Sequence, residues 1–218
     1  MKKYLILAFL AMATVSCKFE DIYVQENVQD LVTYSNGRLT NDIGTVFEVS
    51  ASDISQNDWK VEGQRQLMRF DILNRNLEIH IHETHPMTKV TPDPYEELEE
   101  LPIDPVVIQM GFLSGGYMNL MFTGYQAKGS NHAPQYYFRE SNQNNVVQVY
   151  LYYDGNNENP ATMSSDLLES TNYYVSIPLP ESSGTSYNVV RLQAYRLRQD
   201  SAGKVFSELY VYDFNGSY

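Results

Sequence analysis

The chain has 218 residues, and its 43% hydrophobic and 19% charged side chains exclude an intrinsically disordered protein. Its formal net charge of −12 argues against nucleic-acid binding, which depends on Lys and Arg side chains that displace counterions from phosphates. Aromatic residues make up 13%, and the 18 tyrosines favour half-buried pleated sheets. The composition therefore predicts an all-β protein of one large domain or two modest ones.

Residues 1–16 are predicted to be a lipoprotein signal peptide. Lys2 and Lys3 form a basic start, and Tyr4–Val15 is an apolar stretch too short to span a bilayer. A small residue then precedes Cys17, which resembles a lipobox, although Thr14 occupies the position where Leu is commonest. We expect Cys17 to carry lipid and to anchor the protein. The alternative is a secreted protein with an unmodified thiol.

Cys17 is the only cysteine, which excludes an intramolecular disulfide, and a lipid-bearing thiol is not available for catalysis. Lys18 rather than Asp follows it, which resembles outer-membrane sorting, and the acids Glu20 and Asp21 come next, as in the surface-export signal of some Gram-negative anaerobes. We expect a lipid-anchored outer-membrane protein, exposed at the cell surface, with residues 17–29 as its tether.

Residues 30–92 are predicted to form a small β-barrel of four or five short strands. Asn36-Gly37 supplies the positive φ values that a hairpin turn needs, and residues 44–49 alternate like a strand. Two further strands are expected at 66–73 and 77–84, and their inward side chains are predicted to be Met68, Phe70, Ile72, Leu77, Ile79 and Ile81. Closing these strands into a barrel removes exposed edges. The alternative is an open sheet packed on the second module.

His80 and His82 are the candidate metal ligands. A period of two places them with Glu78 on the strand face opposite Ile79 and Ile81, so two imidazoles and a carboxylate would lie side by side. An exposed polar strand face explains the same pattern, and His-x-His by itself is a weak signal. We therefore predict no metal site and no cofactor, with this pair as the weak exception.

Residues 93–105 are predicted to be an acidic linker between two domains. Pro94, Pro102 and Pro105 restrict its backbone. Its carboxylates would attract calcium or a basic partner, or would simply be solvated: Glu96, Glu97, Glu99, Glu100 and Asp104.

Residues 106–218 are predicted to form an immunoglobulin-like β-sandwich. Turn-rich pieces separate about seven alternating strands, expected at 107–113, 117–123, 135–139, 146–153, 172–177, 188–197 and 205–214. The side chains predicted to face inward are Met118, Leu120, Phe122, Val147, Val149, Leu151, Val190, Leu192 and Ala194.

Two features of this second module point to ligands. Asp154–Glu158 is similar to the start of a calcium loop, but Asn159 and Ser165 stand where that loop requires Gly and Glu, so a hairpin turn is favoured. Tyrosine pairs place one ring on each face of a sheet, and the outward rings would stack on sugars or simply pack. These pairs lie at 136–137, 152–153 and 173–174.

The sequence carries no motif for catalysis. It has no Gly-x-Ser-x-Gly elbow, no phosphate-binding glycine loop and no cysteine besides Cys17. A pair of carboxylates far apart in the sequence is the one catalytic arrangement that stays open. We therefore predict a protein that is not an enzyme and that works by binding.

Several segments, in their order along the chain, resemble the NigD-like lipoproteins. They are the signal with Cys17, Gly-Arg-Leu-Thr-Asn-Asp at 37–42, Phe-Asp-Ile-Leu at 70–73, the linker ending in Asp-Pro-Val, Ser-Gly-Gly-Tyr-Met-Asn-Leu at 114–120 and Ser-Ile-Pro-Leu-Pro at 176–180. The resemblance covers nearly the whole mature chain. It implies an OB-like N-terminal barrel, a C-terminal β-sandwich, a place in the cell envelope and an association with bacteriocin gene clusters.

The expected function is that of a non-catalytic outer-membrane lipoprotein that binds a partner, in an immunity role implied by the resemblance. An acidic surface would steer a basic protein toxin toward it, and the mature chain without Lys2 and Lys3 has a charge of −14. The alternatives are a surface glycan-binding accessory lipoprotein and a structural component of the envelope. The family supplies no functional residues, so the resemblance names no ligand-binding residue.

Overall fold

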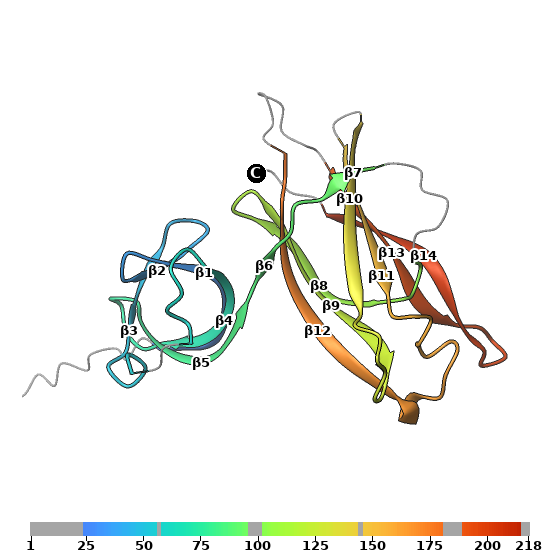
Figure 1. Ribbon diagram of the computed structural model, residues 1–218. Helices are drawn as coiled ribbons and strands as arrows, with labels where there is room; N and C mark the ends of the chain where they lie inside the picture. Colours follow the sequence, from blue (N-terminus) through green and yellow to red (C-terminus); the bar gives the residue numbers. More distant parts are fainter. Residues whose placement is uncertain (1–23, 56–57, 96–101, 144–145, 181–188, 215–218) are drawn as a thin grey trace, which may run out of the picture.

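The computed structural model describes residues 24–55, 58–95, 102–143, 146–180 and 189–214. Within these ranges the chain forms strands, loops and one 3-10 turn at Ser165–Leu167, so the all-β prediction is confirmed. A barrel and a two-sheet sandwich lie side by side, joined by the segment that contains β6 (Figure 1). No helix in the described ranges is long and apolar enough to cross a membrane. Cys17 and the predicted signal peptide fall outside these ranges.

Five strands close into a barrel in the order β1-β2-β3-β5-β4. All neighbours are antiparallel except β3 and β5, and β1 closes the barrel by pairing with β4. The prediction of an OB-like barrel is confirmed. The first strand begins within residues 17–29, which we expected to be tether. The strands are β1 (Gln25–Ser35), β2 (Arg38–Asn41), β3 (Val46–Val49), β4 (Arg65–Ile72) and β5 (Glu78–Pro86).

Local sequence explains the barrel. Asn36 and Gly37 have φ values of 51° and 79°, which form the predicted tight turn between β1 and β2. Inside, Phe70 is fully buried against Phe47, with ring centroids 5.1 Å apart. Trp59 closes the core from the loop before β4, and the predicted side chains of β4 and β5 point inward. Burial of this continuous apolar interior is the main force that holds the barrel closed.

The sandwich packs a four-stranded sheet, β6-β12-β9-β8, on a five-stranded sheet, β14-β13-β11-β10-β7. All seven predicted strands are present, and β11 pairs with β13 in parallel. The connection between the modules adds two short strands that the sequence did not predict, β6 and β7. The strands are β6 (Thr88–Lys89), β7 (Asp93–Pro94), β8 (Val107–Ser114), β9 (Tyr117–Ala127), β10 (Gln135–Gln143), β11 (Val146–Asp154), β12 (Leu168–Pro178), β13 (Val189–Gln199) and β14 (Val205–Phe214).

All nine side chains predicted to face inward belong to the sandwich core, and each is at most 2% exposed. Tyr153 joins them because Gly124, in the middle of β9, leaves room for its ring. A Cβ atom on Gly124 would lie 2.2 Å from Tyr153 Cζ. The Tyr153 hydroxyl donates to the carbonyl oxygen of Tyr125 at 3.2 Å, which satisfies the polar end of a buried ring.

Candidate binding cleft between the two modules

An apolar cluster joins the barrel to the sandwich. Leu31 and Leu67 point out of the barrel, because alternate residues of a strand face opposite sides, and they meet Met87 of the connection. From the sandwich, Phe112 and Tyr174 pack on this cluster. The outer face of β4 is therefore buried as well as its inner face, which fixes the barrel against the four-stranded sheet.

Arg65, the first residue of β4, crosses from the barrel to the sandwich beside this cluster. Its guanidinium makes a two-pronged ion pair with Asp42 of the barrel, and the two side chains are only 13% and 8% exposed. Arg65 also donates to Asn119 Oδ1 at 3.3 Å and to the carbonyl oxygen of Ser114 at 3.4 Å. Since Asn119 Oδ1 also accepts from the Ser176 hydroxyl at 2.7 Å, the buried polar groups at this junction are paired.

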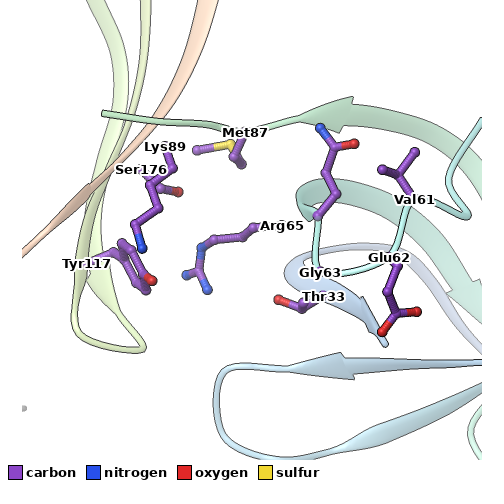
Figure 2. Close-up of a pocket in the computed structure, with 10 residues that line it drawn as sticks. Thr33, Val61, Glu62, Gly63, Arg65, Met87, Lys89, Tyr117 and Ser176 are labelled. Atoms are coloured by element: carbon purple, nitrogen blue, oxygen red, sulfur yellow. The ribbon is translucent and has the colours of Figure 1, made fainter. Parts of the chain in front are cut away.

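A cleft of about 450 Å³ opens next to Arg65, between the two modules. Figure 2 shows Arg65 reaching from the barrel toward Tyr117, while Lys89 approaches the same ring and Glu62 stands on the far wall. The lining comes from both modules and from the connection between them. It consists of Thr33, Val61, Glu62, Gly63, Gln64, Arg65, Met87, Lys89, Tyr117 and Ser176.

The cleft holds two cations beside one aromatic ring. Arg65 Cζ lies 4.8 Å and Lys89 Nζ lies 5.6 Å from the centroid of the Tyr117 ring, which is the range of a cation–π contact. No carboxylate of the described residues lies within 4.0 Å of Lys89 Nζ. Glu62, on the opposite wall, accepts hydrogen bonds from Ser35 Oγ at 2.7 Å and from the backbone N–H of Asn36 at 3.1 Å.

The sequence analysis proposed none of the cleft residues as a functional residue, although Tyr117 and Ser176 lie in segments that carry the NigD-like resemblance. Arg65, Lys89 and Tyr117 come from three segments with no shared spacing, so no periodicity connects them. The turn at Gly115-Gly116, where both φ values are positive, is the only local signal, since it places Tyr117 at the start of β9.

The candidate metal ligands His80 and His82 lie side by side as predicted, with ring centroids 5.0 Å apart. Each imidazole pairs with its own carboxylate: His80 Nδ1 lies 3.0 Å from Asp53 Oδ2, and His82 Nε2 lies 2.9 Å from Asp71 Oδ2. Glu78, the expected third ligand, instead accepts from Asn74 Nδ2 at 2.7 Å. Across the described ranges, no group of three or more His, Cys, Asp or Glu side chains is arranged to hold a metal ion.

Asp53 has a structural role beside His80. Burial raises the pKa of its carboxyl, but hydrogen bonds from the Ile81 N–H, the Ser50 hydroxyl and His80 outweigh burial, and the net pKa lies below the ordinary value. The Ile81 N–H donates at 2.8 Å. The carboxylate therefore fastens the loop after β3 onto β5.

The predicted linker and the calcium-like loop meet at Asp104. Its carboxylate accepts from the N–H groups of Gly155 and Asn157 at 2.9 and 2.8 Å and from Asn159 Nδ2 at 2.8 Å. These contacts leave Asp104 committed to the loop's own amides. The loop is not the hairpin turn that we favoured, because it leads from β11 in the five-stranded sheet to β12 in the four-stranded sheet. The run at 96–101 lies outside the described residues.

The tyrosine pairs were predicted to place one ring outward. The pairs 136–137 and 152–153 follow this prediction, and the pair 173–174 does not. Tyr137 and Tyr152 stand opposite each other on β10 and β11, and Tyr137 is 38% exposed. Beside them Tyr95 stacks on Tyr150, with ring centroids 4.5 Å apart. Tyr174, by contrast, is covered by the barrel, where it stacks on His85 at 4.3 Å.

No protein-family model matches the sequence, and no curated protein sequence matches it. The structure resembles a NigD-like immunity protein from Bacteroides caccae, with a TM-score of 0.55 and 17% identity over 89% of this chain and 98% of that one. It also resembles a protein of unknown function from Bacteroides vulgatus, with a TM-score of 0.56 and 14% identity over 87% and 91% of the two chains. A third similar structure is that of a lipoprotein from Bacteroides fragilis, with a TM-score of 0.55 and 11% identity over 88% of this chain and 98% of that one. The chain therefore shares its fold with a NigD-like protein, as the order of its sequence segments predicted.

Proposed function

We propose that this protein is a non-catalytic, lipid-anchored binding protein of the outer membrane, and that it holds a protein partner in the cleft between its modules. The cleft carries this proposal because both modules and the connection between them build it and because Lys89 faces it without a carboxylate partner among the described residues. Clefts between domains are a common place for ligands to bind.

The groups in the cleft favour binding over chemistry. None of the described residues that line it is a histidine, and the Ser176 hydroxyl, which is a nucleophile only beside a base, donates to Asn119 instead. The Arg65 guanidinium is likewise fixed by Asp42. A rigid rim of paired groups suits recognition of a partner's surface.

The anchor is tested on Cys17. We expect the wild-type protein to partition into detergent and to stay with membranes, whereas a Cys17→Ala variant should do neither. Mass spectrometry of the mature N-terminus should find acyl chains on residue 17. A Cys17→Ala variant that stays fully membrane-bound would remove the anchor from the account.

The name of the Bacteroides caccae structure supports an immunity role. The acidic chain, with a net charge of −12, would attract a basic toxin over distances longer than any single contact. A strain that lacks the gene should lose protection against bacteriocins of related strains, and the intact gene should restore it. Equal survival of the deletion strain and its parent against every such bacteriocin would contradict this role.

A specific surface supports glycan binding as the second candidate. Tyr137 and Tyr152 lie opposite each other on one face of the five-stranded sheet, and Tyr137, which is 38% exposed, offers its ring for stacking on sugars. A glycan array should then show binding that a Tyr137→Ala/Tyr152→Ala double variant loses. An array without any bound glycan would exclude this candidate.

A further inference from the structure

Lys89 is held in place by the fold. It lies on β6, which pairs with β12 through Thr88 and Lys89, and the next residue, Val90, donates to the carbonyl oxygen of Ser176 at 3.0 Å. The backbone on both sides of Lys89 is therefore fixed to the sandwich, and the ammonium is directed toward the Tyr117 ring (Figure 2).

The charge around Lys89 leaves its ammonium available. The nearby Arg65 is neutralised by Asp42, and the Glu62 carboxylate is occupied by Ser35 and Asn36. The Lys89 ammonium beside the Tyr117 ring is therefore the positive charge that an anion in the cleft would meet.

The donors in the cleft select a carboxylate rather than a phosphate. Phosphate sites combine several donors, such as a free Arg fork or consecutive backbone N–H groups. Here the Arg65 fork is filled by Asp42, and the N–H groups of Gly63 and Gln64 donate to the carbonyl oxygens of Tyr34 and Val61. A single ammonium beside an aromatic ring matches a group with one negative charge.

We propose that the cleft binds the C-terminal carboxylate of a basic peptide segment, with Lys89 as its ionic partner and Tyr117, Val61 and Met87 around the last side chain. This inference rests on the proposed function and names the part of the partner that the cleft takes. The net charge of −12 attracts the cationic body of the peptide, and the local cation at Lys89 holds its end. The two effects together favour a basic peptide with a free C-terminus over an acidic one.

The test uses the full chain purified in detergent and two fluorescent peptides that differ in one group. Both have the sequence Lys-Lys-Gly-Ala-Ala-Leu with the dye at the N-terminus, and one ends in a free carboxylate while the other ends in an amide. Fluorescence anisotropy should show at least tenfold tighter binding of the carboxylate form. Equal affinity of the two forms, or no binding of either, would overturn the inference without bearing on the deletion-strain challenge.

Variants locate the site. Lys89→Met should weaken the carboxylate peptide at least tenfold and leave the amide peptide unchanged, whereas Lys89→Arg should restore most of the affinity. Lys204→Met, on the exposed turn between β13 and β14, is the matched control and should have little effect. If Lys89→Met and Lys204→Met weaken binding equally, the peptide binds elsewhere on the acidic surface. That result would overturn the inference.

Inorganic phosphate provides the final arm. The reference is the acetate concentration that displaces half of the bound peptide. If the cleft takes a carboxylate, phosphate at the same concentration should displace no more peptide than acetate does. Phosphate that competes at least tenfold more strongly would show an oxyanion site of another kind and would contradict the carboxylate assignment. Unfolding midpoints of all variants, measured beside the wild type, confirm that each is folded when it is tested.

Discussion

Replacing Arg65 with Met should destabilise the protein strongly, because this side chain joins the two modules through a buried ion pair. Met keeps most of the volume but leaves the Asp42 carboxylate, whose side chain is 8% exposed, without its cation. Removing one partner of a buried pair typically costs about 3–5 kcal/mol. The hydrogen bonds to Asn119 and Ser114 are lost with the guanidinium, which adds to the same cost.

Urea unfolding measures this cost directly. Trp59 is the only tryptophan, it is 4% exposed in the barrel core, and its fluorescence reports the unfolding of the module that holds Arg65. With a urea dependence of about 2 kcal/mol per molar, a loss of about 4 kcal/mol lowers the unfolding midpoint by about 2 M. Arg65→Met should show a shift of that size.

Two comparisons make the result specific. Arg198→Met removes an exposed ion pair with Glu208, and exposed pairs contribute at most about 1 kcal/mol, so its midpoint should shift by less than about 0.5 M. Asp42→Leu combined with Arg65→Met should recover much of the lost stability, because no buried charge remains. If Arg65→Met shifts the midpoint no more than Arg198→Met does, the reasoning about the buried pair is refuted.

Three further predictions concern the fold. Gly124→Ala should lower the free energy of unfolding by about 1–3 kcal/mol, since its Cβ would meet the Tyr153 ring. In a double-mutant cycle, Tyr153→Leu should reduce this cost, and additive costs of the two substitutions would refute the contact. Gly37→Ala should cost about 1–2 kcal/mol at φ +79° despite open space around it, and an unchanged urea midpoint would contradict this. Because the folded pKa of Asp53 is lowered, its stabilisation is complete above the ordinary pKa of about 3.9 and is lost as the pH falls through the folded pKa. Asp53→Asn should therefore show a smaller drop in urea midpoint between pH 5 and pH 2 than the wild type, and equal drops would refute the linkage.

The barrel and the sandwich were predictable because their signals are local. Alternation at Met118, Leu120 and Phe122 fixes which face of β9 is buried, and Asn36-Gly37 fixes one hairpin. The two short strands β6 and β7 were missed because each has only two residues and takes its partner from a distant strand, which leaves no periodicity to detect.

The cleft was not predictable for the same physical reason. Arg65, Lys89 and Tyr117 meet only after the barrel has docked on the sandwich through Leu67 and its neighbours. Alternation in β4 marks Leu67 as facing away from the barrel core, and an apolar residue on an outer barrel face is the one sequence signal of a module interface. That signal locates the interface but does not identify its charges.

Protection in living cells tests the central claim most directly. A deletion strain that carries the wild-type gene, the Lys89→Met variant or the Lys204→Met variant is challenged with the bacteriocin to which the deletion strain is sensitive, with equal expression confirmed by immunoblot. If the cleft holds the partner, the wild type and Lys204→Met restore growth and Lys89→Met does not. Full protection by Lys89→Met would contradict the claim that the partner binds in this cleft.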